Sequence, residues 1–284
     1  MNSDNKTKNL IAYQIFYDER TKSLVDSEFI PLDNSKNERS DWREYWPMRS
    51  VLKTVEFDDN DYVGFFSPKF TQKTGLTSAH VREFFETVTA STQIDIPDVI
   101  SFSPYPDLCA IFVNIFEQGE TNHSGITKLA IEVFEVLNIE INIQSMVNDS
   151  TTNIFSNFFI ATPRFWNKWL DICEKIFDIC EDKNSNLGQR LNQVVDHGLT
   201  IDAQAKVFLI ERIATIILET TDFSCEPYTS KILPFELSKL IPFRDELFIC
   251  DRLKNSYRKT GKIEYLNMFS SQRTKIIYSL SKNP

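Results

Sequence analysis

The sequence predicts a single α/β domain in which a sheet is flanked by helices and is followed by a helical C-terminal extension. Short apolar runs typical of buried strands alternate with stretches whose apolar residues recur at helical spacing. The 284 residues suffice for a sizeable core, and no Pro/Gly/Ser-rich linker divides them. We therefore expect residues 1–230 to form the sheet domain and residues 231–284 to pack on it as helices.

The expected strands are apolar runs that stop at polar or proline-containing turns. They are Leu10–Tyr17, Tyr62–Phe66, Asp98–Phe102, Asn157–Ala161 and an edge strand within Asp222–Thr229. Ile139–Val147 is either a strand or an extended loop, and loops are expected at Glu28–Asn37 and Glu181–Thr200. The expected helices run from Thr77 or Ser78 to Ala90, then Ile126–Leu137, Pro163–Cys180, Asp202–Thr220, Phe235–Leu240, Asp245–Thr260 and Ile263–Ser281.

The clearest helix signal follows Thr162-Pro163. A threonine hydroxyl can cap the first turn, and proline fits the first helical position because its missing N–H would have no intrahelical partner there. The apolar residues that follow fall on one stripe, which predicts burial: Phe165, Trp166, Trp169, Leu170, Cys173, Ile176, Phe177 and Cys180. In the strand before it, Asn157 is polar in apolar company, which marks it as a candidate ligand contact.

The composition narrows the function classes. A net charge of −9 disfavours a nucleic-acid partner, and no run of 18 uncharged apolar residues predicts a membrane span. With a polar N-terminal stretch and five scattered cysteines, we expect a cytoplasmic protein with reduced thiols. The segment from Asp251 to Pro284 carries eight Lys/Arg and two acids, so it is either a solvated helical face or a contact for anionic lipid head groups at the inner membrane face.

Several chemistry-bearing residues lie where predicted strands end. Tyr17 and Asp18 follow the first strand, at the kind of edge where open α/β sheets bind ligands. Lys69 follows the second strand and could meet a phosphate as a point charge. Each of these positions is equally compatible with a turn that only reverses the chain or with a solvated side chain.

Three further clusters are ambiguous between packing and binding. Asp41–Arg49 holds three aromatics and two arginines, which either wedge a loop onto the core or line a sugar or base site. Glu117–His123 is dense in polar groups and is either a site or an idle surface loop. Glu211 and Arg212 lie in an apolar helical stretch, so they either pair with each other or one of them faces a ligand.

Common catalytic motifs are missing from the sequence. The seven glycines form neither G-x-G-x-x-G nor a Walker loop, which removes most dinucleotide oxidoreductases and P-loop enzymes. There is no H-x-x-x-H, H-E-x-x-H or G-x-S-x-G, and three histidines leave little for a zinc centre. What remains is an α/β fold that binds a polar ligand through carboxylates, amides and aromatics, for which sugars and nucleotide sugars are suitable.

The order of these motifs resembles small bacterial glycosyltransferase-like proteins found with capsule and lipopolysaccharide genes. The residues that carry the resemblance are Val63-Gly64-Phe65-Phe66, Asp98-Val99-Ile100, Glu117-Gln118, His123, Asn157-Phe158-Phe159-Ile160 and Glu211-Arg212. The resemblance spans residues 10 to 220 and implies a GT-A type fold, a single mixed α/β sheet that binds a nucleotide sugar at the strand ends. It implies transfer of a sugar from a nucleotide-diphosphate donor to a surface-polysaccharide or glycolipid acceptor.

The leading hypothesis assigns a role to each candidate residue. Tyr17 and Asp18 would border the nucleotide, Arg49 and Lys69 the diphosphate, Trp42 and Trp46 a sugar face, and Asn157 the donor sugar. Glu117, Glu120 or His123 would supply a base or orient the acceptor hydroxyl, and Glu211 would order the site.

The sequence departs from the GT-A pattern in one respect, since it has no Asp-x-Asp directly after a strand. Asp107 is the nearest acidic residue after a strand exit. Either this carboxylate and substrate phosphates hold Mg²⁺ or Mn²⁺, or Lys69 or Arg49 meets the diphosphate charge without a metal. Two rival functions follow, a non-catalytic glycan- or partner-binding protein and a peripheral membrane scaffold that acts through the basic C-terminus.

Overall fold

The computed structural model describes residues 7–90, 96–195, 203–228 and 239–282. A six-stranded mixed sheet has the order β2-β1-β3-β5-β4-β8, and a two-stranded antiparallel sheet pairs β6 with β7. The strands are β1 (Asn9–Phe16), β2 (Ile30–Asp33), β3 (Asp61–Phe66), β4 (Val99–Ser101), β5 (Phe159–Ala161), β6 (Val194–Val195), β7 (Ala203–Gln204) and β8 (Cys225–Pro227).

The strand directions bring most strand ends to one edge of the large sheet, which we call the functional edge. β1 is parallel to β2 and β3, and β4 is parallel to β8, whereas β5 is antiparallel to both of its neighbours, β3 and β4. The carboxyl ends of the five other strands therefore lie at the same edge as the start of β5. Loops at this edge are where open α/β sheets bind ligands.

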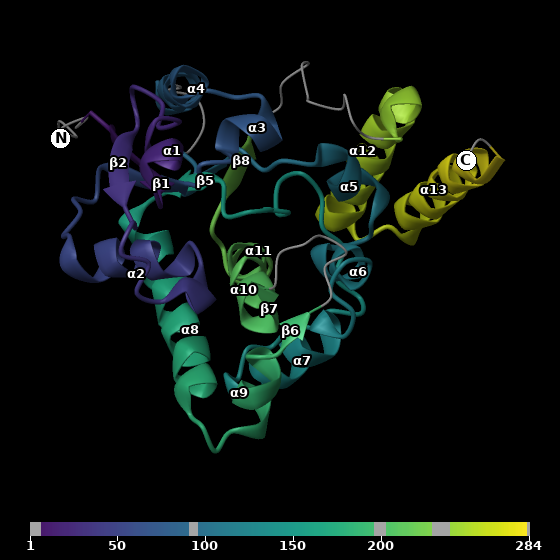
Figure 1. Cartoon of the computed structure of the whole chain (residues 1–284). Helices are drawn as coiled ribbons and strands as arrows, with labels where there is room; N and C mark the ends of the chain where they lie inside the picture. The colour runs from purple at the N-terminus through teal and green to yellow at the C-terminus, as the bar shows by residue number, and fades with distance from the viewer. Residues whose placement is uncertain (1–6, 91–95, 196–202, 229–238, 283–284) are drawn as a thin grey trace, which may run out of the picture.

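Helices cover both faces of the sheet (Figure 1). They are α1 (Glu19–Lys22), α2 (Tyr45–Thr54), α3 (Phe70–Thr74), α4 (Ser78–Thr89), α5 (Pro106–Ile111), α6 (Ile115–Glu120), α7 (Ile126–Val136), α8 (Pro163–Glu181), α9 (Asn186–Leu191), α10 (Ala205–Ile210), α11 (Ile213–Thr220), α12 (Arg244–Thr260) and α13 (Ile263–Lys282).

Alternation along β3 separates two cores. Val63 and Phe65 face the larger core, which contains residues of α2, α8 and α11, because successive side chains of a strand point to opposite faces. Tyr62 and Phe66 face a smaller aromatic core beneath α3 and α4. Gly64 lies between them, where an added Cβ would come within 2.4 Å of Ile160 in β5. The pairing of β3 with β5 therefore depends on a glycine here.

The aromatic helix α8 forms as the sequence predicts. The Thr162 hydroxyl accepts a hydrogen bond from the Phe165 N–H, and Pro163 is the first helical residue. Trp166 and Trp169 are fully buried, and the Trp166 indole N–H donates to the Val63 carbonyl at 2.8 Å. This hydrogen bond ties the predicted core helix directly to the central strand.

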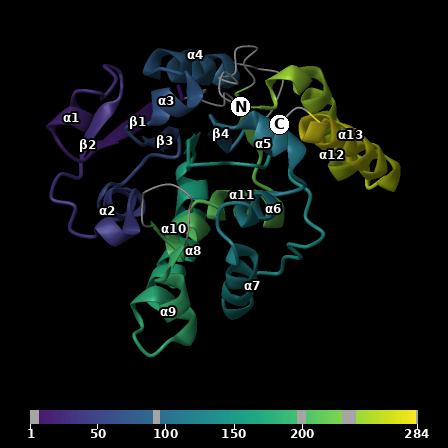
Figure 2. The ribbon, with the colours of Figure 1, turned by 45° about the vertical axis from the view of Figure 1, so that its right-hand side comes forward.

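The C-terminal helices pack on the rest of the fold through buried polar contacts. Both views show α12 and α13 side by side next to α5 (Figures 1 and 2). Lys254 is fully buried, and its ammonium donates to the backbone carbonyls of Cys109 and Phe112. Arg258 pairs with Glu219. Arg273 pairs with Glu117, so at least three of the eight basic residues after Asp251 are held by contacts within the fold.

Some predicted elements differ in the structure. Residues Ile30–Asp33 form the exposed edge strand β2 within a predicted loop. Of the two alternatives for Ile139–Val147, the structure has the loop, which contains a turn, and not the strand. The predicted Asp202–Thr220 helix is broken into α10 and α11 at Glu211-Arg212. The predicted Glu181–Thr200 loop contains α9, and His197 and most of the predicted Phe235–Leu240 helix lie outside the described residues.

The fold class expected from the sequence is confirmed. A six-stranded mixed sheet is flanked by helices, and the C-terminal segment is helical. The five cysteines are free, and four of them are buried. Within the described residues, no helix is long and apolar enough to cross a membrane.

Candidate functional site

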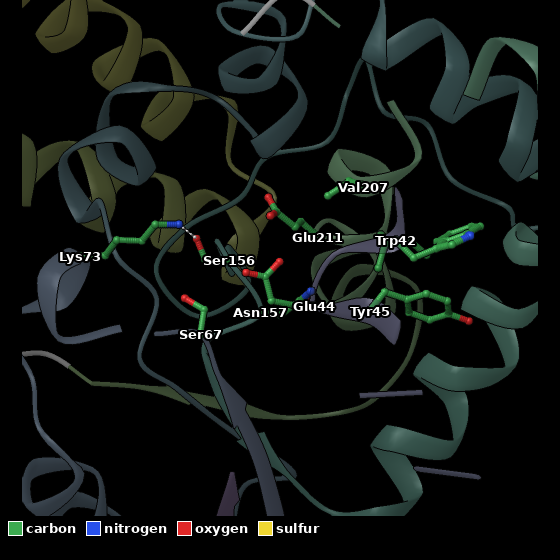
Figure 3. Close-up of a pocket in the computed structure, with 10 residues that line it drawn as sticks. Trp42, Glu44, Tyr45, Ser67, Lys73, Ser156, Asn157, Val207 and Glu211 are labelled. Carbon is green, nitrogen blue, oxygen red and sulfur yellow. Dashed lines mark hydrogen bonds between the residues drawn. The ribbon is translucent and has the colours of Figure 1, made fainter. Parts of the chain in front are cut away.

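A pocket opens at the sheet edge where β3 ends and β5 begins. The space between its walls is about 390 Å³ when the open mouth is counted. Its walls come from five separate parts of the chain, and Figure 3 shows how the side chains lie. The lining residues are Trp42, Glu44, Tyr45, Ser67, Lys73, Ser156, Asn157, Val207, Ile210 and Glu211.

Ser156 and Asn157 form the turn into β5, and both have left-handed backbones with φ of 60° and 52°. The β3–β5 register pairs Val63 with Ala161 and Gly64 with Ile160, so continuing it brings Asn157 opposite Ser67. Asn157 is only 7% exposed, and its side-chain oxygen has no hydrogen-bond partner in the described part of the chain. A buried, unsatisfied amide oxygen in a strained turn is typical of a functional site.

Glu44 immediately precedes α2 and brings a carboxylate to the pocket. The Tyr17 phenol, which follows β1, donates a hydrogen bond to it. Burial and the neighbouring Glu44 charge both raise the pKa of Tyr17, so the phenol stays protonated and remains a donor. Tyr17 therefore holds Glu44 in place from behind.

Glu211 reaches the pocket because the chain breaks between α10 and α11. Burial of its carboxyl raises its pKa, and the nearby Glu44 charge adds to that effect, whereas Lys73 and Arg212 oppose it. Arg212 points the other way, into the core, where its guanidinium donates to the Phe208 carbonyl. Burial lowers the pKa of Arg212 to about 10. The pocket thus receives the carboxylate of this pair and not the guanidinium.

Lys73, in the last turn of α3, is the cation among the lining residues. Its ammonium lies 3.0 Å from the Ser156 hydroxyl and 5.6 Å from the centre of the Phe158 ring. In Figure 3 the Lys73 ammonium, the Ser156 hydroxyl and the Glu211 carboxylate point toward one another. One positive and several hydrogen-bonding groups therefore converge on the same space.

The aromatic wall offers edges rather than open ring faces. The Trp42 indole N–H is directed toward Glu181 and the Tyr45 hydroxyl donates to Glu174, so both rings extend away from the polar centre (Figure 3). Trp42 is only 1% exposed, and the buried Lys206 ammonium lies 4.2 Å from the centre of its ring. Trp42 therefore has almost no free face on which a sugar could stack.

Arg49, predicted to contact the diphosphate, and Trp46, predicted to contact a sugar face, lie instead where α2 packs on α8. Arg49 binds Glu174 through two of its nitrogens, at 2.5 and 2.8 Å. Trp46 stacks on Phe177 with ring centres 6.2 Å apart and contacts the Arg39 guanidinium. Neither Arg49 nor Trp46 lines the pocket.

Two residues at strand ends serve as turn formers. Asp18 caps α1, because its carboxylate accepts hydrogen bonds from the Thr21 N–H and hydroxyl at 2.7 Å. The same contacts lower the pKa of Asp18. Lys69 precedes α3, where its backbone N–H donates to the Ser67 hydroxyl. Both lie near the functional edge, yet neither side chain lines the pocket.

The predicted Glu117–His123 loop is largely helix α6, capped by Asn114. Glu117 accepts from the Val113 N–H and pairs with Arg273 of α13. Glu120 accepts from the backbone of Gly125 and Thr127, at the start of α7. These two carboxylates connect helices and do not line the pocket.

His123 is 5% exposed and stacks on Phe208, with ring centres 3.5 Å apart. It packs against α10 from the side of α6 and does not line the pocket. The predicted trio of Glu117, Glu120 and His123 is therefore not brought to the site that contains Asn157 and Glu211.

The predicted metal ligand Asp107 is buried in the first turn of α5. Among the described residues, no group of three or more His, Cys, Asp or Glu side chains is arranged to hold a metal ion. Within this part of the chain, Asp107 therefore has no companion ligands with which to hold a metal ion.

Sequence reasoning missed Glu44, Ser67, Lys73 and Ser156. Glu44 lies inside the aromatic cluster that did attract attention, and Ser67 and Lys73 flank Lys69. Their common signal is a polar residue within one turn of a strand end or helix start. That signal is too frequent in α/β sequences to single them out.

Comparison with known proteins gives limited information. No protein-family model matches, and no curated protein matches. Among solved structures, the chain is similar to an apo structure of the bifunctional glycosyltransferase WbbM, with a TM-score of 0.44 and 13% identity over 78% of this chain. The match spans 44% of that protein's length. Because this similarity is low, we base the proposals below on the residues of the pocket.

Proposed function

We propose that this protein is a glycosyltransferase that moves a sugar from a nucleotide-diphosphate donor to a polysaccharide or glycolipid acceptor. The observation that carries the proposal is the pocket where β3 ends and β5 begins, with Asn157, Glu44 and Glu211 directed into it. Amide and carboxylate oxygens beside hydroxyls are suited to a polyol, and this edge is where α/β sheets place ligands.

In this proposal Lys73 neutralises charge on the donor diphosphate. Its ammonium is already fixed by Ser156 and Phe158, so little side-chain entropy remains to be lost on binding. A compact ammonium can follow charge as it develops on the leaving phosphate. A divalent ion would neutralise further charge on the diphosphate, so donor binding and turnover are measured with and without Mn²⁺.

Glu211 is the proposed general base. The acceptor hydroxyl attacks the anomeric carbon, the bond from that carbon to the phosphate oxygen breaks, and the nucleoside diphosphate leaves with the bonding electrons. The hydroxyl proton passes to Glu211, whose pKa is raised by burial toward the operating pH, as a base requires. Glu44, held by the Tyr17 phenol, is assigned to a hydroxyl of the donor sugar.

The test combines binding with turnover on a panel of UDP-, GDP-, CMP- and dTDP-sugars. We expect at least one donor to raise the melting temperature and to be consumed with release of its nucleotide. Glu211→Gln should lower kcat by about 10²–10⁴-fold without lowering the melting temperature. Glu135→Gln, at an exposed position of α7, is the matched control and should behave as wild type.

Two results would decide against the proposal. If no donor on the panel stabilises the protein or is consumed, the nucleotide-sugar proposal fails. Donor binding without release of nucleotide, in the presence of glycan and lipid-linked acceptors, would favour the non-catalytic glycan-binding alternative. Full activity of Glu211→Gln would leave the transferase proposal intact but remove Glu211 as its base.

A further inference from the structure

The charges of the pocket are unbalanced. Two carboxylates, Glu44 and Glu211, lie near enough for the charge of one to affect the other. Lys73 is the single cation among the lining residues. The net charge of these three side chains is therefore about −1 when both carboxylates are ionised. A ligand carboxylate placed beside Glu44 and Glu211, away from Lys73, would be repelled.

The groups that face the pocket away from Lys73 are mainly hydrogen-bond acceptors. The buried Asn157 oxygen lacks a partner within the described structure, and the two carboxylates are acceptors only when ionised. Lys73 donates one of its N–H groups to Ser156 and keeps the others for a phosphate. Away from Lys73, the two carboxylates and the Asn157 oxygen are acceptors, so this part of the pocket is complementary to a ligand that donates through O–H or N–H groups.

The orientation of the Asn157 amide is built into the backbone. The backbone carbonyl of Asn157 accepts a hydrogen bond from the N–H of Phe159, the first residue of β5, at 3.1 Å. The left-handed turn holds the Asn157 side chain at the pocket. Leaving such a buried acceptor unsatisfied destabilises the free protein. A ligand that supplies a donor at this point recovers that free energy, whereas a ligand carboxylate cannot.

From these three observations we infer that the pocket selects a donor sugar that is uncharged, or carries an amine, and rejects a uronic acid. In this arrangement the sugar hydroxyls donate to Asn157 and Glu44, Glu211 stays available to the acceptor hydroxyl, and the phosphates lie beside Lys73. A C6 carboxylate in place of the hydroxymethyl group removes a donor and places a negative charge beside the carboxylates. This inference rests on the proposed function.

Matched nucleotide sugars that differ only at C6 test it. The probes are UDP-glucose with UDP-glucuronate, UDP-galactose with UDP-galacturonate, UDP-N-acetylglucosamine with its uronate, and GDP-mannose with GDP-mannuronate, measured by calorimetry. We expect the uncharged member of the bound pair to bind at least tenfold more tightly. Glu44→Gln should narrow that ratio by lowering the repulsion, and Glu135→Gln should leave it unchanged.

The outcomes separate the inference from the proposed function. Equal or tighter binding of a uronate overturns the inference alone, because the pocket would still be a nucleotide-sugar site. A preference for the uncharged sugar that Glu44→Gln and Glu211→Gln both leave unchanged also overturns it, because selection would then arise elsewhere. Absence of binding by all four pairs overturns the inference, and the proposed function fails as well only if no CMP- or dTDP-sugar of the donor panel binds either.

Discussion

Replacing Asn157 with glycine separates a ligand contact from a structural amide. Glycine keeps the left-handed backbone, for which φ is 52°, and removes the buried side-chain oxygen that lacks a partner in the described structure. Alanine would be a poorer test because a Cβ is strained at this φ. The variant therefore changes the amide while preserving the turn into β5.

The expected magnitude follows from two opposing contributions. Removing an unsatisfied buried acceptor recovers about 1–3 kcal/mol, and the flexibility of glycine in the unfolded chain costs about 0.5–1 kcal/mol. We expect a net gain of about 0.5–2 kcal/mol in the free energy of unfolding. For a chain of this size, that corresponds to a rise of roughly 1–8 °C in melting temperature.

Asn138 provides the matched control. It is also an asparagine with a left-handed backbone, at φ 54°, but it is exposed at the end of α7. Asn138→Gly changes the backbone contribution alone, so the difference between the two variants isolates the Asn157 amide. The assay is urea or thermal unfolding of both variants, with and without the nucleotide sugar that stabilises the wild type. Only Asn157→Gly should lose that stabilisation.

The reasoning would be refuted if Asn157→Gly destabilised the free protein by more than about 1 kcal/mol relative to Asn138→Gly. Asn157 would then be a satisfied structural amide, since losing a made hydrogen bond costs about that much. Retention of the full ligand-induced stabilisation would equally contradict a contact between this amide and the ligand.

Three further predictions test other parts of the structure. Burial alone would raise the pKa of Glu174, but hydrogen bonds from Arg49, Lys53 and Tyr45 lower it from 4.5 to about 2. Glu174→Gln should therefore lower the free energy of unfolding by about 2–3 kcal/mol at pH 7. This stability is present above pH 4.5 and is lost as pH falls toward 2, so acid unfolding curves of variant and wild type should converge there. Lys254→Met should destabilise the whole domain by about 3 kcal/mol in urea unfolding, because two buried carbonyls lose their donor; a loss confined to α12 in hydrogen exchange would show instead an independent extension. Glu117→Gln should change stability by less than about 1 kcal/mol and leave donor turnover unchanged, because its ion pair with Arg273 is partly exposed; a large loss of turnover would restore Glu117 as a catalytic candidate.

Local sequence patterns predict those elements that have a strong apolar run or stripe and clear end signals. β1, β3 and α8 have continuous or striped apolar residues and clear ends, and their positions agree with prediction within a residue or two. β2 was not predicted because Pro31 and Asp33 have low strand propensity and the strand is exposed at the sheet edge. The parallel pairing with β1 determines its conformation, and that pairing is not visible in the local sequence.

The break between α10 and α11 was missed for a related reason. Neither proline nor glycine marks Glu211-Arg212, and apolar residues continue on both sides. Of the two alternatives for this pair, mutual pairing or one charge facing a ligand, the second is compatible with a Glu211 carboxylate that lines the pocket. Where the carboxylate points depends on tertiary packing and could not be predicted.

The same distinction applies to the site as a whole. Asn157 and Glu211 were recognisable as polar residues in apolar runs, and both line the pocket. Lys73 and Ser156 meet across 83 positions of sequence, and no periodicity or spacing reports such a contact. Conversely, Glu117 and Glu120 looked functional because polar residues are dense there, but their partners are the backbone and Arg273.

The measurement that tests the central claim most directly is the position of a bound nucleotide sugar in a crystal of the complex. We predict that the sugar ring lies within hydrogen-bond distance of the Asn157 and Glu44 side chains, with its anomeric carbon toward Glu211 and a phosphate beside Lys73. A sugar bound elsewhere on the molecule, with this pocket filled only by solvent, would contradict the assignment of the site.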